Sequence, residues 1–130
     1  MKKLIGVLII IVLLITGGIL EEIFINKTTD KLVYYSSNLE TLFKDNQENI
    51  NTTEINEEFS KLKIFWDETE DVLCYITNFE KIRTLDENIT KLESAIKYND
   101  FSVASENLAL IKNYKEVLHY VLGANIDNVL

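Results

Sequence analysis

The chain has 130 residues, with 13 Lys and Arg against 21 Asp and Glu and a formal net charge of −8. All acidic residues follow position 20, so the body repels phosphate groups, which argues against binding to nucleic acid or to anionic lipid. One Cys and one His exclude an intramolecular disulfide and the usual structural zinc site, and the absence of Pro favours long helices.

The first predicted element is a membrane anchor. Leu4–Leu20 contains no charged residue and follows two lysines, Lys2 and Lys3. As a helix this run reaches ~26 Å, and extension to Ile25 crosses a hydrocarbon core of ~30 Å. The expected partner of this segment is membrane lipid, and its representative anchor residues are Leu4, Ile10, Leu14 and Leu20.

A secretory signal peptide has the same basic start and apolar run, so cleavage is the alternative to a retained anchor. Small residues before a cut are present at Thr16, Gly17 and Gly18, but the favoured Ala-x-Ala pattern is missing. Under both interpretations the N-terminus stays in the cytoplasm and the body lies outside it. We therefore predict a single-pass protein of the cell membrane, with a head and anchor over 1–25 and an extracytoplasmic bundle over 26–130.

Four amphipathic helices are predicted from apolar residues that recur at spacings of three and four. The first stripe follows the polar stretch 26–31 and holds Leu32, Tyr35, Leu39 and Leu42. The second holds Ile55, Phe59, Leu62, Trp66, Leu73 and Ile76, with Thr69 in the slot before Leu73. The third holds Phe79, Ile82, Leu85, Ile89, Leu92 and Ile96, and the fourth holds Phe101, Ala104, Leu108, Ile111, Leu118 and Val121. We expect helices over 4–45, 53–76, 79–98 and 101–122.

Capping residues and short loops give the expected topology. Capping boxes are predicted for Asn51 with Glu54 and for Thr77 with Glu80, an N-cap at Asp100 and a helix end at Gly123. Short connections imply antiparallel neighbours, so loops 44–52 and 98–100 lie far from the membrane and turn 77–78 lies near it. The predicted fold class is all-α: an N-terminal transmembrane helix that continues into an antiparallel bundle of about four helices.

The chain offers few candidate site residues. Core anchors are predicted at Leu62, Trp66, Leu108 and Ile111, and stacking of a ligand on the single tryptophan is the lesser alternative. The acidic cluster at 67–71 lacks the spacing of a calcium loop, so we interpret it as a solvated face. A thiol–imidazole pair would require Cys74 and His119 to meet, and we interpret them as a buried thiol and a helix-end histidine.

The C-terminal tail ends in apolar residues that a polar disordered segment would not need. We expect Ile126, Val129 and Leu130 to dock on the bundle, on the bilayer interface or on a partner, so they form a candidate partner-binding tail. The six tyrosines exceed what the stripes bury, and exposed Tyr is typical of protein interfaces.

Several features of the chain occur together in a known layout. They are the Lys-led anchor, Leu62-x-x-x-Trp66, the acidic Ile/Leu-rich helix from Glu80 to Glu93, Leu108-x-x-Ile111, Leu118-His119 and the ending Ile126-x-Asn128-Val129-Leu130. This layout resembles an uncharacterised family of single-anchor membrane proteins of clostridia and other Firmicutes, domain of unknown function four-three-six-three. The family often has a His in the turn after the Trp helix, which this chain lacks at 77–80. The resemblance implies the architecture and brings no activity.

The function expected from these features is that of a membrane-anchored extracytoplasmic interaction or scaffold module, with another membrane protein as partner. One alternative is a sensor or ligand-binding ectodomain. Because 117–130 is too short and polar for a second membrane span, a sensor would act through a partner. Another alternative is a secreted bundle after cleavage. Without a nucleophile–base pair, a metal set or a Gly-rich loop, we expect neither enzymatic activity nor a cofactor.

Overall fold

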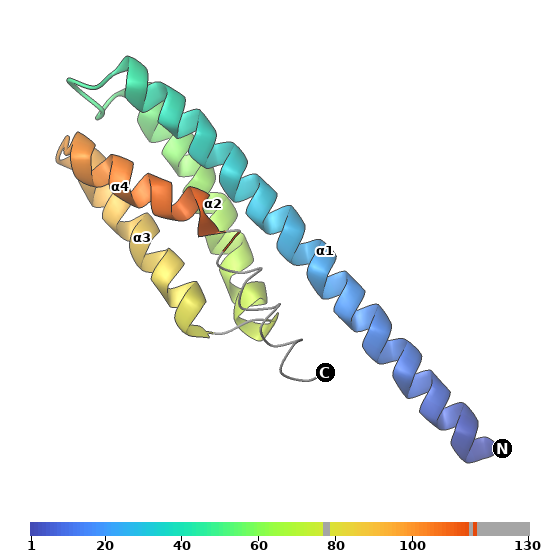
Figure 1. The fold of residues 1–130 in the computed structure, drawn as a ribbon. Coiled ribbons are helices and arrows are strands. Elements are labelled where there is room, and N and C mark those ends of the chain that lie inside the picture. Colours follow the sequence, from blue (N-terminus) through green and yellow to red (C-terminus); the bar gives the residue numbers. More distant parts are fainter. Residues whose placement is uncertain (77–78, 115, 117–130) are drawn as a thin grey trace.

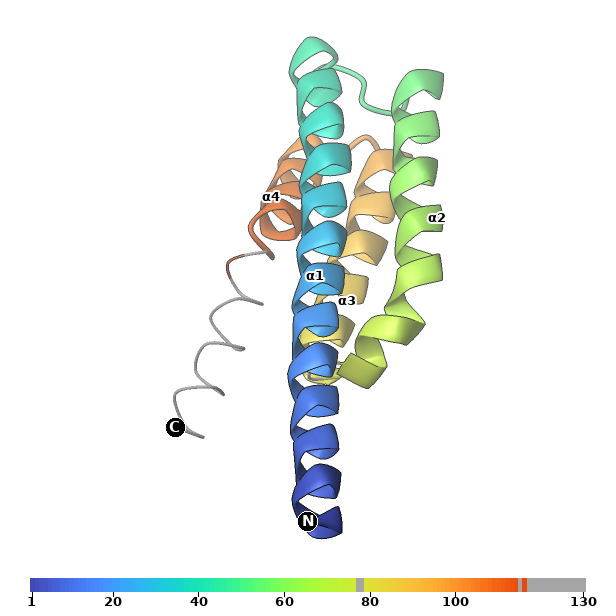
Figure 2. The same ribbon diagram turned by 90° about the vertical axis from the view of Figure 1, so that its right-hand side faces the viewer.

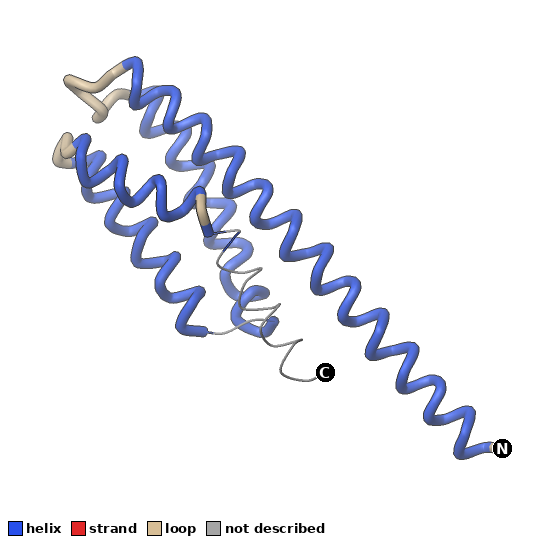
Figure 3. Tube along the Cα trace, viewed as in Figure 1, coloured by secondary structure: helices blue, strands red, loops and turns tan. Residues whose placement is uncertain are grey.

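The computed structural model describes residues 1–76, 79–114 and 116. The elements in chain order are α1 (Lys2–Asp45), α2 (Thr53–Ile76), α3 (Phe79–Lys97) and α4 (Phe101–Lys112), and the described residues contain no strand (Figures 1 and 3). The predicted all-α fold is therefore confirmed. The bounds of the first three helices differ by at most two residues from those predicted.

The four helices form an antiparallel bundle in which each helix packs against two others. α1 lies against α2 and α4, and α3 lies against the same two helices. The chain reverses its direction between successive helices (Figure 2). The N-terminal part of α1 extends well beyond the other three helices (Figure 1). The predicted bundle, carried by a long N-terminal helix, is thus confirmed.

The core is one cluster of apolar side chains from all four helices and from the loop residue Ile50. In the predicted α2 and α3 stripes, every residue from Ile55 to Leu73 and from Ile82 to Ile96 is buried, including Thr69. The largest fully buried side chains are Trp66, Phe43, Ile25, Leu32, Leu39, Ile50, Ile55, Leu62, Leu73, Ile82, Leu85 and Ile89. Burial of one such side chain contributes roughly 1.5–3 kcal/mol relative to its exposure, so this core can hold the bundle together without a disulfide.

The buried face of α1 differs from the predicted stripe. Tyr35 and Leu42 are only half-buried, and the buried residues are Ile25, Thr28, Thr29, Leu32, Ser36, Leu39 and Phe43. The apolar pattern did not indicate this face, because three of its residues are Thr or Ser. A Thr or Ser hydroxyl can be buried when it donates a hydrogen bond to the carbonyl one turn earlier in its own helix. Thr29 Oγ1 donates to the carbonyl oxygens of Ile25 at 3.0 Å and Asn26 at 3.1 Å. The packed part of α1 therefore begins at Ile25, just before the polar stretch, and continues through it with Thr28 and Thr29.

The two loops at the far end of the bundle are joined by Asn99. Its backbone φ of 54° is in the left-handed region. Asn99 Oδ1 accepts a hydrogen bond from the Ile50 N–H at 2.7 Å, and its Nδ2 donates to the Glu48 carbonyl at 3.1 Å. Loops 46–52 and 98–100 therefore lie side by side at the end opposite the N-terminus, as Figure 1 also shows.

Two of the predicted helix ends are corrected. The expected box of Asn51 and Glu54 is absent, because α2 begins one residue later than that box requires and Thr52 Oγ1 accepts from the Ile55 N–H at 3.2 Å. The predicted fourth helix is interrupted at Asn113, where α4 ends after Lys112 and ψ is 0°, and the predicted end at 122 lies outside the described residues.

The remaining capping predictions divide into one that is confirmed and two that lie outside the described residues. Asp100 caps α4 by accepting a hydrogen bond from the Val103 N–H at 3.2 Å. Thr77, which the second predicted box requires, and Gly123 are not among the described residues.

Candidate functional site

The most extended exposed surface of the described chain is the apolar part of α1. Leu4, Ile10, Leu14 and Leu20 are all more than half exposed, and none of the most apolar window is buried. α1 is the single described helix that is long and apolar enough to cross a membrane, a criterion that a signal sequence also meets. The predicted anchor residues thus form one uncovered apolar cylinder.

This apolar cylinder and the bundle share one continuous helix. α1 passes without a break through Gly17 and Gly18, and Thr16 Oγ1 donates back to the Val12 carbonyl at 2.8 Å. Only residues 21–24 separate the last uncharged residue of the run from Ile25, which is buried in the core. The apolar segment and the packed part of α1 therefore belong to one continuous helix.

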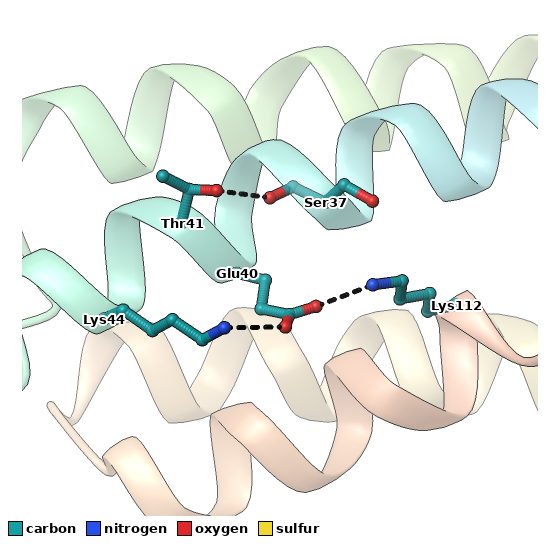
Figure 4. Close-up of polar contacts among 5 residues, drawn as sticks. All are labelled: Ser37, Glu40, Thr41, Lys44 and Lys112. Carbon is teal, nitrogen blue, oxygen red and sulfur yellow. Dashed lines mark hydrogen bonds and ion pairs between the residues drawn. The ribbon is translucent and has the colours of Figure 1, made fainter.

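An ion-pair cluster ties α1 to α4 (Figure 4). Glu40 accepts from Lys112 Nζ at 2.9 Å and from Lys44 Nζ at 3.2 Å. The hydrogen bond from Lys112, and then that from Lys44, holds the pKa of the Glu40 carboxyl below its ordinary value. Thr41 Oγ1 donates to the Ser37 carbonyl at 3.1 Å, and this hydrogen bond lies within α1. Sequence spacing gave no signal for the contact between α1 and α4, because its partners are far apart in the chain.

A small groove lies beside this cluster, between α1 and α4. It has a volume of about 270 Å³. Its lining includes the apolar residues Phe43, Phe101, Leu108 and Ala109 and the charged residues Glu40, Lys44 and Lys112. The groove therefore combines an apolar lining with two ammonium groups and one carboxylate.

Aromatic side chains gather where α1 and α2 pack together. The rings of Tyr35 and Phe65 are 5.7 Å apart between centroids, and those of Tyr34 and Tyr35 are 5.5 Å apart. Lys31 Nζ lies 5.3 Å from the centroid of Phe65. We call Lys31, Tyr34, Tyr35 and Phe65 the aromatic patch. Tyr34 is exposed, so this patch reaches the surface of the bundle.

Trp66 lies in the core, away from any surface where a ligand could stack on it. Its side chain is fully buried, and Nε1 donates to Asp86 Oδ1 of α3 at 3.0 Å. The other predicted core anchors, Leu62, Leu108 and Ile111, are buried as well. Asp86 was missed by sequence reasoning, which placed it on no apolar stripe.

The acidic cluster at 67–71 is mostly solvated. Asp67 pairs with Lys63 at 3.2 Å, and Glu70 is the one half-buried member. Burial, followed by the nearby charge of Asp86, raises the pKa of Glu70 above its ordinary value. Within the described part of the chain, no group of three or more His, Cys, Asp or Glu side chains is placed to hold a metal ion.

Cys74 is a poor candidate for a nucleophile. Its side chain is half-buried, and burial, followed by the charges of Glu70 and Asp71, raises the pKa of its thiol. The thiol therefore stays protonated at neutral pH, and only the thiolate is strongly nucleophilic.

Burial also raises the pKa of Tyr114, whose hydroxyl is enclosed without a hydrogen-bond partner.

The remaining predicted site residues are not among those that the structure describes. They are His119 and the tail residues Ile126, Val129 and Leu130. Their roles stay predictions.

No significant match to the chain was found among curated proteins or among solved structures. One family model matches residues 21–129, which begins where the uncharged run of α1 ends and includes the whole bundle. The match confirms the family that the motifs from Leu62 onward indicated. The chain belongs to the family described as domain of unknown function (DUF4363).

Proposed function

We propose that the chain is a single-pass, membrane-anchored helical module that binds another membrane protein outside the cytoplasm. The continuity of α1 carries this proposal, because one unbroken helix joins an uncovered apolar cylinder to a packed bundle. Such a cylinder is unstable in water and is covered either by lipid or by other apolar helices.

The orientation follows from the charges on either side of the apolar run. Lys2 and Lys3 precede it, and all 21 acidic residues follow it. Basic residues are retained on the cytoplasmic side, so the bundle lies on the opposite side.

The aromatic patch is the surface that we assign to the partner. Tyr and Phe are enriched at protein interfaces, and a cation over an aromatic ring adds to the attraction. The patch lies on α1 and α2, above the membrane segment, where another single-pass protein could reach it. We propose a binding role rather than catalysis, since the half-buried thiol of Cys74 is held protonated.

The location and orientation are tested with the full chain fused at its C-terminus to alkaline phosphatase, which is active only outside the cytoplasm. We expect active phosphatase in the membrane fraction that resists an alkaline wash. Exchange of Lys2 and Lys3 for Glu should reduce the activity. An inactive fusion in the wild-type chain would contradict the orientation, and a mature chain lacking its first residues would show that the apolar segment is cleaved.

The partner role is tested by crosslinking in native membranes with matched variants. A Leu4–Leu20 segment replaced by an unrelated apolar helix should still capture the same membrane protein, because the bundle makes the contact. Tyr34→Ala should weaken capture, whereas Tyr98→Ala at the far end of the bundle should not. Equal capture by both tyrosine variants would overturn the assignment of the aromatic patch.

A ligand-binding role that acts through a partner is the second candidate, and the groove between α1 and α4 favours it. Its apolar lining beside Lys44 and Lys112 suits a small amphipathic anion. A thermal-shift series with medium-chain fatty acids tests this role. Stabilisation of the wild-type chain that is lost in Lys112→Gln would support it, and equal curves with and without ligand would exclude these ligands.

A further inference from the structure

The junction between the apolar run and the bundle is very short. Residues 21–24 are the only ones between Leu20 and the buried Ile25, and in a helix they rise ~6 Å. The headgroup layer on each side of a bilayer is about 5–8 Å deep. If the apolar run crosses the membrane as proposed above, the near end of the bundle lies within that layer, without a gap filled by water.

The register of α1 and α2 shows which residues lie at that near end. Phe65 of α2 is level with Lys31 and Tyr35 of α1, since its ring lies 5.3 Å from the Lys31 ammonium and 5.7 Å from the Tyr35 ring. The two helices run in opposite directions and have the same rise per residue. Moving ten residues on from Phe65 reaches Tyr75, and moving ten residues back along α1 reaches 21–25.

The side chains exposed at that level suit the boundary between lipid and water. Tyr75 is 91% exposed and Val72 is 43% exposed, although both are apolar over most of their surface. Tyr is enriched at headgroup level, where its ring meets apolar chains and its hydroxyl meets water. Glu21, Glu22 and Asp71 lie at the same end of the bundle, so anionic headgroups would be repelled.

We propose that the near end of the bundle is a second membrane contact, in which Tyr75 and Val72 rest in the headgroup layer of a zwitterionic bilayer. The contact rests on the proposed membrane anchoring and extends it. The continuous α1 fixes the height of the bundle above the membrane, and the packing of α2 against α1 brings Tyr75 to that height. The far loops are then held ~33 Å above this contact, by the length of α2 from Thr53 to Tyr75.

The test uses the full chain in phosphatidylcholine vesicles. Cys74→Ser removes the native thiol, and Tyr75→Cys then carries a polarity-sensitive fluorophore. Tyr98→Cys in the same background is the matched control, because Tyr98 is 72% exposed at the far end. We expect the probe at position 75 to shift to the blue and to lose fluorescence to lipids spin-labelled near the headgroup. The probe at position 98 should do neither.

Two outcomes separate the failure of this contact from the failure of the anchor. Equal, water-like signals at positions 75 and 98 in protein that survives an alkaline wash would overturn the contact and leave the anchor intact. Release of the protein by the wash would overturn both. Vesicles that contain phosphatidylglycerol should weaken the quenching at position 75. Stronger quenching there would overturn the assignment to zwitterionic headgroups.

Discussion

Trp66 is the residue on which the core depends most. It is fully buried and its indole N–H is bound to Asp86. Trp66→Ala should lower the free energy of unfolding by roughly 3–5 kcal/mol, because it leaves a large cavity and an unpaired acceptor. Denaturation of the full chain in detergent, followed by circular dichroism, measures this loss. Tyr98→Ala should stay within about 0.5 kcal/mol of the wild type, as expected for an exposed site. Equal curves for both variants would contradict the core placement.

Two glutamates should show opposite effects on stability. The pKa of Glu40 is lowered in the folded chain, so its carboxylate stabilises the bundle above pH 4.5, and this gain is lost as the pH falls through the lowered pKa. The pKa of Glu70 is raised, so its carboxylate destabilises the bundle at neutral pH, and this cost disappears as the pH falls to about 4.5.

Glu40→Gln should therefore lower stability at pH 7, and Glu70→Gln should raise it. Each change should be under about 1 kcal/mol, because both groups are partly solvated. The difference for Glu70→Gln should vanish as the pH falls to about 4.5, whereas that for Glu40→Gln should shrink only below pH 4.5. Melting curves between pH 3 and pH 7 test the pair. A difference of the same sign for both variants at pH 7 would contradict the two environments.

At this scale the sequence predicts burial better than it predicts partners. Trp66 and Leu62 lie on a stripe that periodicity alone places in the core. The acceptor Asp86 is 20 residues away from Trp66, and the Glu40–Lys112 contact spans 72 residues. Such pairs depend on how the helices are rotated and aligned, which a one-dimensional pattern does not contain.

At the scale of elements, α1 shows how small polar residues can belong to a core. Ser36 is fully buried, and its hydroxyl has no hydrogen-bond partner. Ser36→Ala should raise the free energy of unfolding by roughly 1–2 kcal/mol, since it removes an unsatisfied hydroxyl. Ser37→Ala, one position round the same helix, controls for helix propensity and should gain only about 0.5 kcal/mol. Equal gains in a denaturant titration would show that the Ser36 hydroxyl is satisfied.

The far loops depend on one asparagine. Asn99→Ala removes two hydrogen bonds to the neighbouring loop, and these bonds offset the strain of a residue with a Cβ in the left-handed region. We expect a loss of about 2–4 kcal/mol from these two effects. Asn99→Gly should lose less, because Gly adopts this conformation freely. Hydrogen exchange of the Ile50 amide reports the loop directly. If Asn99→Gly were as damaging as Asn99→Ala, the backbone conformation would carry no part of the effect.

At the scale of the whole molecule, short loops and strong stripes were enough to predict the antiparallel bundle. They could not predict the groove between α1 and α4, because its lining comes from two helices that are far apart in the sequence. They also could not predict where the packed part of α1 begins, since Thr28 and Thr29 read as polar. That starting point matters most for function, because it sets the distance between the bundle and the end of the apolar run.

The distance between the apolar run and the bundle can be increased without rotating the bundle about the axis of α1. Eleven residues of a helix make almost a whole number of turns and add ~16 Å. An insertion of eleven alanine, glutamate and lysine residues after Glu22 should therefore lift the bundle out of the headgroup layer with little rotation. We expect the probe at position 75 to lose its quenching by headgroup labels, while the chain stays in the membrane. The same insertion after Gln47, in a far loop, should leave the quenching unchanged. Quenching that persists after the insertion would mean that α1 bends below the bundle. The continuous α1 would then not fix the height of the bundle above the membrane.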